Sequence, residues 1–404
     1  MDNSQSQSLD ANKLENWIQT GAASFEAGNY VEAGKDLTEA CEIAYHLHRK
    51  KEQALSLLLL GKVRRAEGQY EAAYSALKPA LELRLQLFGE KSLETAEILD
   101  ELGCTDFDAG KLEEGKDHFS RALDIRQSIQ PQNELDLASS YCNFGLLLMR
   151  LDRTAEAESM LSKSLGIRKR LLPMRNPRIA ESLLSLAELQ LNKGNMTLSL
   201  PLAEEGCQIY ESKFGKDHPK TAQAMHTRGV LYQHAGKFKE SAKLFESAIK
   251  AQEEKLPESH PSTISSINEY AATYLRLGKA KEAKEQYEKA LALCQKNEAI
   301  GDETSITSLI GLGVSNLEQH EYKQAEEHIK QALSMLDRVR KNAVFLEKSL
   351  LYNLLHSLIW QGKFGDALRL VPDTVRARET AHVTEMAEML KRLYEMASSQ
   401  ESKK

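Results

Sequence analysis

The sequence predicts an all-α protein, a right-handed α-solenoid of nine helix pairs followed by a capping helix. Three observations lead to this fold class. A small residue in an apolar helical stretch recurs along the chain, first after 40 residues and then six times after 42, and a leucine takes its place after one more step of 42. A large apolar residue stands four positions before each member of this row, and a second small residue stands twelve positions after it. A fixed period of this length is typical of solenoids, in which each unit buries its core against its neighbours.

The three rows predict how the two helices of a pair meet. Large apolar residues, spaced three to four positions from other apolar residues, form a buried stripe on the first helix. Small residues let the second helix approach closely, where a longer side chain would force the axes apart. The large row is Trp17, Leu57, Leu99, Tyr141, Leu183, Met225, Ile267, Leu309 and Leu351. The first small row is Gly21, Gly61, Gly103, Gly145, Ala187, Gly229, Ala271 and Gly313, with Leu355 at its end, and the second is Ala33, Ala73, Gly115, Ala157, Ser199, Ser241, Ala283, Ala325 and Ala367.

A turn with a glycine separates the two helices of most pairs, because glycine accepts the left-handed conformation that commonly ends a helix. Three prolines, Pro79, Pro201 and Pro372, fall inside the predicted second helices. An interior proline costs ~3 kcal/mol and kinks or shortens a helix, so local bends are expected there. The turn glycines are Gly28, Gly68, Gly110, Gly194, Gly236, Gly278 and Gly362.

The repeats are expected to fill residues 13–378, with different structure at both ends. Residues 1–12 and 398–404 are polar and predict disordered tails. Residues 379–397 carry an apolar stripe that predicts one last helix, which either caps the ninth repeat or occupies the protein's own groove. The nine repeats are predicted at about 14–52, 53–94, 95–136, 137–178, 179–220, 221–262, 263–304, 305–346 and 347–378.

The rows and the joins between pairs resemble the tetratricopeptide repeat, in the longer 42-residue form of kinesin light chain and its relatives. The joins FGKDHPKTA and PESHPSTI resemble that family's Gly-x-Asp-His-Pro join. Asp217 or Ser259 is expected near the start of the following helix, with Pro219 or Pro261 in its first turn. The resemblance implies a helical repeat protein that binds other proteins or peptides.

Two departures limit what the resemblance implies. Only residues 1–12 precede the first repeat, so the coiled coil that binds the motor chain in kinesin light chain is not expected. Motor-chain binding is therefore not supported. The asparagines that line the family's cargo groove are reduced to scattered ones, such as Asn143, Asn268 and Asn353, so the family's cargo preference is not transferred.

Charge and composition argue against several classes of partner. The chain has 53 Lys and Arg against 59 Asp and Glu, a net charge of −6, which gives no electrostatic reason to bind nucleic acid or a membrane. Apolar runs such as Leu57–Leu60 are far below the ~20 residues that span a bilayer, and the N-terminus lacks the features of a secretion signal. Five cysteines form no CxxC pair, so reduced thiols and a cytoplasmic location are expected.

Two near matches to catalytic motifs are better explained by the repeat. GKLEEGKD, from Gly110 to Asp117, has the spacing of a phosphate-binding loop, but an aspartate stands where Ser or Thr must ligate magnesium. His320 and Glu321 open an HExxH pattern in which Gln324 replaces the second histidine. No catalytic residue, metal site or cofactor is expected, and the protein is not expected to be an enzyme.

The curved stack is expected to leave a concave groove that binds a peptide segment or a protein. In tetratricopeptide proteins the first helices line that surface, so the resemblance implies which positions face inward. The lining mixes apolar and charged side chains, which suits a partner with apolar anchors and charges, although some of these residues would instead pack against neighbouring helices. The candidates are Ile18, Phe25, Leu58, Lys62, Arg65, Phe107, Asp108, Leu146, Met149, Arg150, Lys193, His226, His234, Asn268, Arg276 and Tyr352.

The sequence therefore predicts a noncatalytic interaction scaffold or adaptor that holds a protein or peptide in this groove. Two alternatives stay open. One is a peptide-sensing regulator whose solenoid pitch changes when the ligand binds. The other is a regulatory subunit of an enzyme complex, which differs only in what the partner does.

Overall fold

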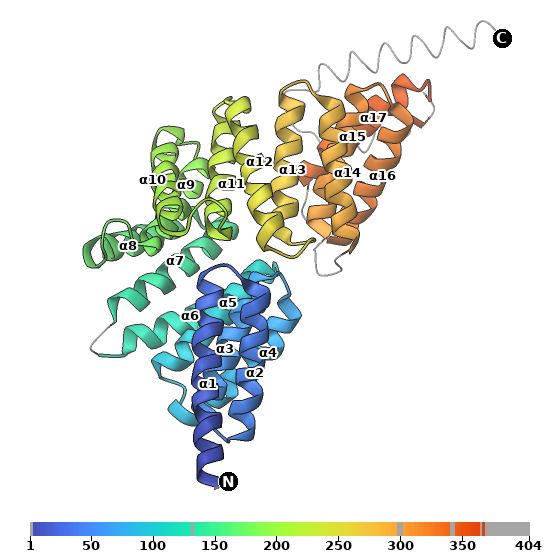
Figure 1. The fold of residues 1–404 in the computed structure, drawn as a ribbon. Coiled ribbons are helices and arrows are strands. Elements are labelled where there is room, and N and C mark those ends of the chain that lie inside the picture. Colours follow the sequence, from blue (N-terminus) through green and yellow to red (C-terminus); the bar gives the residue numbers. More distant parts are fainter. Residues whose placement is uncertain (1–2, 131–132, 297–301, 340–343, 364–365, 368–404) are drawn as a thin grey trace, which may run out of the picture. The chain divides into compact units, whose positions relative to one another are not determined.

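The computed structural model describes residues 3–130, 133–296, 302–339, 344–363 and 366–367, and these ranges contain α-helices and no strand (Figure 1). The chain divides into two compact units, residues 1–263 and residues 264–404, and each is described by itself. The predicted all-α class is confirmed.

The helices form pairs, each made of a first and a second helix, and eight pairs are complete in the described residues. The first unit contains α1 (Asn3–Glu26) and α2 (Tyr30–His46), α3 (Lys50–Ala66) and α4 (Tyr70–Phe88), α5 (Leu93–Asp108) and α6 (Leu112–Ser128), α7 (Glu134–Arg150) and α8 (Thr154–Leu171), α9 (Pro177–Asn192) and α10 (Met196–Phe214), and α11 (Pro219–His234) and α12 (Phe238–Lys255). Then follow α13 (Pro261–Arg276) and α14 (Ala280–Lys296), α15 (Asp302–Glu318) and α16 (Tyr322–Val339), and α17 (Val344–Trp360), the first helix of the ninth pair.

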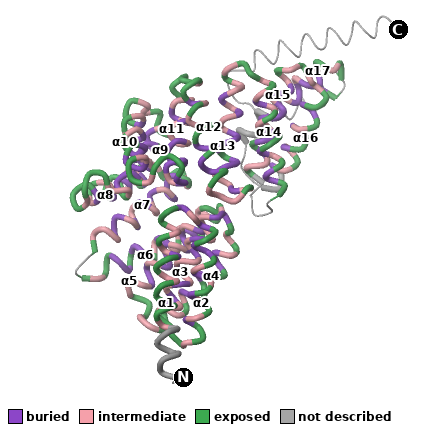
Figure 2. The backbone as a smooth tube through the Cα atoms, viewed as in Figure 1, coloured by how far each residue is buried: buried purple, intermediate pink, exposed green. Residues whose placement is uncertain are grey.

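Within a pair, a glycine of the first helix makes room for a large side chain of the second. A Cβ added at Gly61 would lie 2.6 Å from Leu77, and one added at Gly103 would lie 2.8 Å from the Phe119 ring. Both partners are buried, so a larger residue in this row would push the helices apart. The close contact that the small row predicts is therefore present, and Figure 2 shows buried positions recurring along the helices.

The turns inside the pairs have the predicted left-handed backbone. All seven turn glycines have φ between 71° and 76°. In the two pairs that lack the glycine, Asp152 and His320 take the same place with φ of 59° and 63°. Asp and His adopt this conformation more readily than most residues, so the turn keeps its shape without glycine.

The N-terminal part of the chain differs from the prediction. Helix α1 begins at Asn3, whereas the sequence predicts a disordered tail over residues 1–12. No glycine or proline interrupts residues 3–12, so nothing in the backbone stops the first helix from extending through them.

Two prolines lie inside helices without ending them. Helices α4 and α10 run through Pro79 and Pro201, and the bends expected there stay predictions. Pro372, the capping helix predicted over 379–397 and the tail predicted over 398–404 lie outside the described residues.

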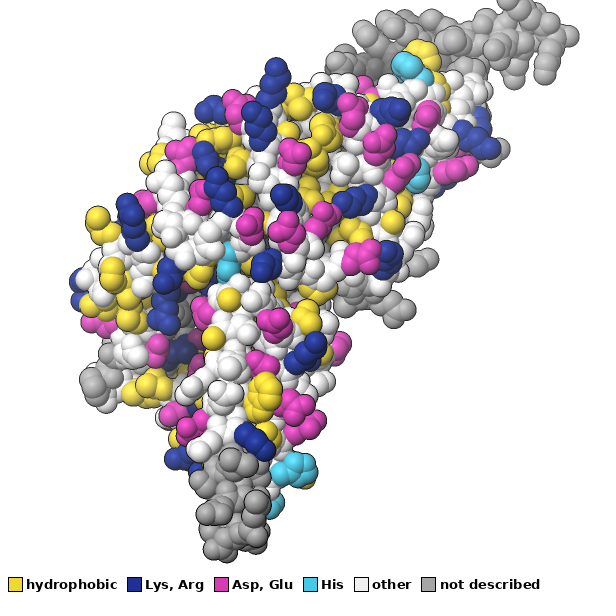
Figure 3. Space-filling view, in the orientation of Figure 1, with side chains coloured by type: hydrophobic (Ala, Val, Ile, Leu, Met, Phe, Trp, Pro, Cys, Tyr) yellow, Lys and Arg dark blue, Asp and Glu magenta, His cyan; other side chains and the backbone are white. Residues whose placement is uncertain are grey.

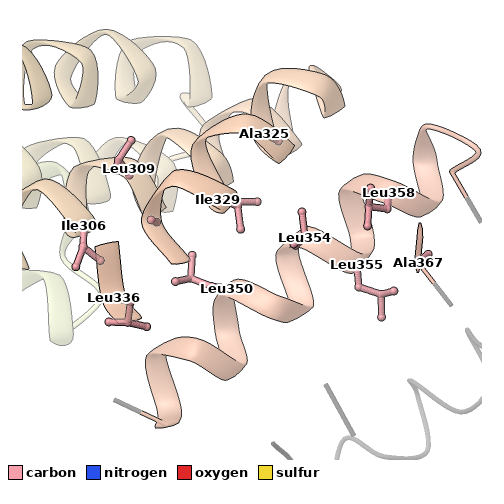
Figure 4. Packing of buried hydrophobic residues seen from close by; sticks show 11 residues of the cluster. Ile306, Leu309, Ala325, Ile329, Leu336, Leu350, Leu354, Leu355, Leu358 and Ala367 are labelled. Carbon is pink, nitrogen blue, oxygen red and sulfur yellow. The ribbon is translucent and has the colours of Figure 1, made fainter. Parts of the chain in front are cut away.

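In the second unit, a core cluster joins α15, α16 and α17. Ile306 and Leu309 of α15, Ile329 of α16, and Leu350 and Leu354 of α17 are buried together (Figure 4). Burial of such a side chain contributes about 1.5–3 kcal/mol. The first helix of the ninth pair is therefore held by the pair before it.

In the first unit, two late joins contact two turns near the start of the chain. In the join between α10 and α11, His218 Nε2 lies 3.1 Å from the carbonyl oxygen of Glu26, at the turn between α1 and α2. In the join after α12, His260 Nε2 lies 2.9 Å from the carbonyl oxygen of Ala66, at the turn between α3 and α4. The stack of helix pairs thus winds far enough for its later repeats to meet its first two.

The same two histidines cap the helices that follow them. Nδ1 of His218 accepts a hydrogen bond from the Lys220 backbone N–H, and Nδ1 of His260 accepts one from the Ser262 N–H, each at 3.1 Å. The two contacts together require the neutral ring with its proton on Nε2, which donates to the carbonyl oxygen. The capping side chain is therefore the histidine and not the preceding Asp217, which the sequence places near the start of the helix.

Apolar and polar contacts surround these hydrogen bonds. A Cβ at Gly28 would lie 2.7 Å from Pro219 Cδ, and a Cβ at Gly68 would lie 2.7 Å from Pro261 Cδ. Lys255 Nζ donates to Asn29 Oδ1 at 2.9 Å. We call the contacts of His218, Pro219, Lys255, His260 and Pro261 with the first two turns the closure contacts.

Candidate concave binding face

Neighbouring first helices of the first unit touch one another from α1 through α11, whereas neighbouring second helices of the described residues make no comparable contact. In a curved stack of helix pairs, the layer with the closer spacing is the inner one. We therefore expect the exposed side chains of the first helices to line the concave face of the first unit.

An ion-pair network bridges α3 and α5 on this face. Lys62 Nζ lies 3.2 Å from Glu97 Oε1 and 3.8 Å from Glu101 Oε1. Arg65 Nε lies 3.4 Å from Glu101 Oε2, and Arg65 Nη1 donates to Asp108 Oδ2 at 2.9 Å. Both cations are thus balanced by carboxylates of the next repeat, so neither is left to attract an acidic partner.

Burial and charge oppose each other in this network. Burial alone would lower the pKa of the Arg65 guanidinium, but Glu101 and Asp108 outweigh it and raise the pKa. Burial raises the pKa of Asp108, against the effect of Arg65. Burial likewise raises the pKa of the neighbouring Cys104 thiol. The face therefore holds a fixed cation and a thiol that stays protonated, which is a poor nucleophile.

The next first helices carry a cation on an aromatic ring. The Arg150 guanidinium lies 5.6 Å from the centroid of the Phe107 ring. Burial raises the pKa of Glu188 on α9, and Arg150 partly opposes this. Arg150 is exposed, and no ion pair or hydrogen bond of its side chain occurs within the described part of the chain. Unlike Lys62 and Arg65, Arg150 is not paired with a carboxylate of a neighbouring helix, so its guanidinium can bind an acidic group of a partner.

Three of the predicted groove residues are core residues. Leu58 is fully buried and belongs to a core cluster with Leu77, and Met149 is 7% exposed. Asn268 is buried and accepts a hydrogen bond from Ser308 at 2.9 Å. The prediction that these three line the groove is wrong, because the next helix pair covers them.

Four more predicted residues are half-buried against the core. Ile18 packs on a core cluster of its own helix pair, and Phe25 and Leu146 pack on clusters that also include residues of the next pair. The His226 ring meets the Phe245 ring edge-on at 5.5 Å, and burial lowers the pKa of His226 to about 4. His226 is therefore neutral at pH 7 and offers no charge to a partner.

Three of the remaining predicted residues lie at or just beyond the ends of first helices. Lys193 is exposed and pairs with Glu158 at 2.8 Å. His234 of the first unit and Arg276 of the second are exposed. Tyr352 lies in α17, but its side chain is outside the described residues.

Two carboxylates that sequence reasoning missed complete the network. Glu97 and Glu101 are four residues apart, and Asp108 follows seven residues later, which places all three on one face of a helix. Lys62 and Arg65 are spaced three apart in the preceding first helix. These matched spacings, one repeat apart, are the signal that could have predicted the pairing.

The two near matches to catalytic motifs have structural roles. Gly110 forms the left-handed turn before α6, and a Cβ at Gly115 would lie 2.9 Å from Leu147. His320 forms the left-handed turn before α16. Across the described ranges, no three His, Cys, Asp or Glu side chains are grouped as a metal would require, and no helix there could cross a membrane.

Comparison with known proteins decides the family. The tetratricopeptide repeat family model matches residues 52–128, 178–254 and 262–338, and a second model of the same description matches residues 137–176. The chain belongs to the tetratricopeptide repeat family. Its repeats are those that the resemblance to kinesin light chain implied.

Solved structures with TM-scores above 0.5 show the same fold at low sequence identity, while no curated protein matches the chain. A Rap protein complexed with competence and sporulation factor is 14% identical, with a TM-score of 0.61 over 96% of this chain and 99% of that chain. The quorum sensor NprR from B. thuringiensis, in its apo form, is 16% identical, with a TM-score of 0.56 over 91% and 98%. A Podosopora anserina putative kinesin light chain with nearly identical repeats is 22% identical, with a TM-score of 0.43 over 50% and 97%.

Proposed function

We propose that this tetratricopeptide repeat protein is a noncatalytic scaffold or adaptor that binds a peptide segment or a protein on the concave face of its first unit. The observation that carries the proposal is the Arg150–Phe107 pair on neighbouring first helices, 5.6 Å apart and with the guanidinium exposed. Tetratricopeptide repeats commonly serve protein interaction. Within the described part of the chain, the Arg150 side chain makes no ion pair or hydrogen bond, so its guanidinium can still bind a carboxylate of a partner.

Arg150 and Phe107 offer a partner two kinds of contact. A guanidinium can bind a carboxylate through two parallel hydrogen bonds, while an aromatic ring takes apolar groups or a second cation. Arg and aromatic residues are also the types that dominate binding energy at protein interfaces. We expect the partner to place a carboxylate at Arg150 and an apolar side chain near Phe107.

Lys62, Arg65 and their carboxylates would act differently from Arg150. Because their charges are already balanced across α3 and α5, a partner gains little by approaching them. Their role is to fix the spacing of the second and third repeats and so the shape of the face. Partner affinity would then depend on Arg150 far more than on Lys62.

A noncatalytic role agrees with the chemistry of the face. The pKa of Cys104 is raised by burial, so its thiolate is scarce at pH 7. The pKa of Glu188 is also raised by burial, but no nucleophile accompanies it. We also propose a cytoplasmic location, because all five cysteines are free thiols and a reducing compartment keeps them so.

A second candidate function is peptide sensing, in which the bound segment changes the curvature of the solenoid. It is favoured by the fold shared with the Rap protein complexed with competence and sporulation factor over nearly the full length of both chains. The closure contacts would then have to respond to the ligand. A scaffold would leave the closure contacts unchanged when the partner binds.

The test is affinity purification with quantitative mass spectrometry, using the full chain and matched variants. The binding variant is Phe107→Ala with Arg150→Glu, and the control is Lys243→Glu with Lys250→Glu, two exposed lysines of α12. A specific protein should be recovered by the wild type and the control and lost from the binding variant. Equal recovery with all three proteins would refute binding on this face.

A further inference from the structure

The end of α8 and the start of α9 lie in a strongly basic stretch. Residues 159–180 contain six Lys and Arg and no Asp or Glu, in a chain whose net charge is −6. One of the six, Arg168, is a buried structural residue that donates to the Arg178 carbonyl oxygen and to Ser182 Oγ, both at 2.8 Å. The others need a different explanation, because they are exposed.

Exposed apolar side chains stand among these cations. Met174 is 88% exposed and Leu171 is 44% exposed, and both lie at the join between α8 and α9. Figure 3 shows Lys and Arg side chains beside hydrophobic side chains over α8. The basic patch, as we name it, consists of Lys169, Arg170, Leu171, Met174, Arg175 and Arg178.

Contacts within the chain account for only part of the patch. Lys169 pairs with Glu205 at 3.5 Å, and Arg170 pairs with Glu134. The side chains of Arg175 and Arg178 have no ion pair, hydrogen bond or ring contact in the part of the chain that the structure describes. Two guanidinium groups therefore keep their full capacity for a partner.

Helix stability does not explain Arg175 and Arg178 either. They lie just before and within the first turn of α9, where the helix dipole is positive and a cation is unfavourable. The first turn of α9 has no acidic residue, as in α11 and α13, whereas those of α5 and α7 each have at least one. Each cation at such a site costs about 0.3–1 kcal/mol, so folding alone would favour acidic residues here.

We propose that the basic patch docks an acidic protein segment in which carboxylates flank an apolar residue. Arg175 and Arg178 bind the carboxylates, and Met174 contacts the apolar residue with a side chain that adapts to irregular surfaces. A protein segment fits better than an anionic membrane, because a chain of net charge −6 is repelled by that surface outside the patch.

The patch is separate from the concave face. Helix α7 has 17 residues, about 26 Å at 1.5 Å per residue. Glu134, which pairs with Arg170 of the patch, lies at its start, and Arg150 of the concave face lies at its end. The patch therefore goes beyond the proposed groove function, because it allows a second partner to be held at the same time.

The test uses the full chain and a fluorescently labelled synthetic peptide that has two leucines flanked by glutamates, followed by anisotropy. Arg175→Glu with Arg178→Glu should weaken peptide binding by at least about tenfold, which is about 1.4 kcal/mol. Met174→Ser should weaken it by a smaller factor. The matched control, Lys243→Glu with Lys250→Glu, makes the same charge change on α12 and should leave binding unchanged.

Three results would overturn the proposal: no binding of the peptide to the wild type, equal weakening in the control, or binding of phosphatidylserine vesicles in place of the peptide. Circular dichroism confirms that each variant is folded. The variant Phe107→Ala with Arg150→Glu separates the two sites: peptide binding on the patch is kept in this variant, whereas peptide binding on the concave face is lost, so a failure of the concave face and a failure of the patch are distinguishable.

Discussion

Replacing Gly68 by alanine tests whether the closure contacts hold the first unit together. Gly68 has φ of 74°, and its added Cβ would lie 2.7 Å from Pro261 Cδ. Gly110 takes the same place one repeat later, with φ of 75° and nothing within 4 Å of its added Cβ. The two substitutions share the backbone cost of a left-handed alanine, about 1–2 kcal/mol, and differ only in the contact with the later join.

The magnitude of the difference follows from that contact. The proline ring is rigid, so the join must move away, and such overpacking costs about 1–3 kcal/mol. The movement also weakens the 2.9 Å hydrogen bond from His260 to Ala66, which contributes about 1 kcal/mol. Gly68→Ala should therefore destabilise the first unit by about 2 kcal/mol more than Gly110→Ala.

Tryptophan fluorescence can report this unit alone. The chain has two tryptophans, Trp17 in α1 and the exposed Trp360 in α17, so a Trp360→Phe background leaves Trp17 as the reporter. Urea unfolding of both alanine variants in this background gives the two free energies. Equal destabilisation would refute the closure, since the Pro261 contact would then contribute nothing.

Two further predictions use the same approach. Gly103→Ala should destabilise the protein by about 1–3 kcal/mol, because its Cβ would lie 2.8 Å from the buried Phe119 ring. The control Gly166→Ala, in a helix and with nothing within 4 Å of the added Cβ, should stabilise the protein by about 0.5–1 kcal/mol. If urea unfolding shows that both substitutions change the free energy of unfolding in the same direction, the close packing at Gly103 is contradicted. Burial lowers the pKa of His260 to about 4 from an ordinary 6.5. The unfolded chain therefore binds the proton first, and the stability from His260 is complete above pH 6.5 and falls by about 2 kcal/mol on acidification to pH 5. His260→Asn keeps a cap like that of Asn176 and should reduce this pH dependence of the urea midpoint; an unchanged dependence would contradict the assignment.

Much of the fold was predictable because the large and small residues that pack each helix pair recur about every 42 residues. Gly61 and Leu77 meet inside one pair, so their spacing alone predicts their contact. The closure contacts were not predictable in this way. They join Ala66 to His260, 194 positions apart, and depend on small rotations that accumulate over several repeats.

The candidate site was predicted less well than the fold. Helical spacing placed Leu58 and Arg65 on the same inward stripe, but it could not show that the next pair buries Leu58 completely and leaves Arg65 half-buried. Residue type alone suggested that Lys62 and Arg65 would attract a partner. Their carboxylates lie in the next repeat, so their neutralisation appears only when both repeats are considered together.

Site-specific photo-crosslinking tests the central claim, that the concave face binds the partner. A photoreactive phenylalanine analogue at Phe107 probes the face, and the same analogue at Val31, an exposed position of the second helix α2, serves as the control. The protein recovered by affinity purification should crosslink at position 107 and not at position 31. Crosslinking at position 31 alone, or equally at both, would contradict the account.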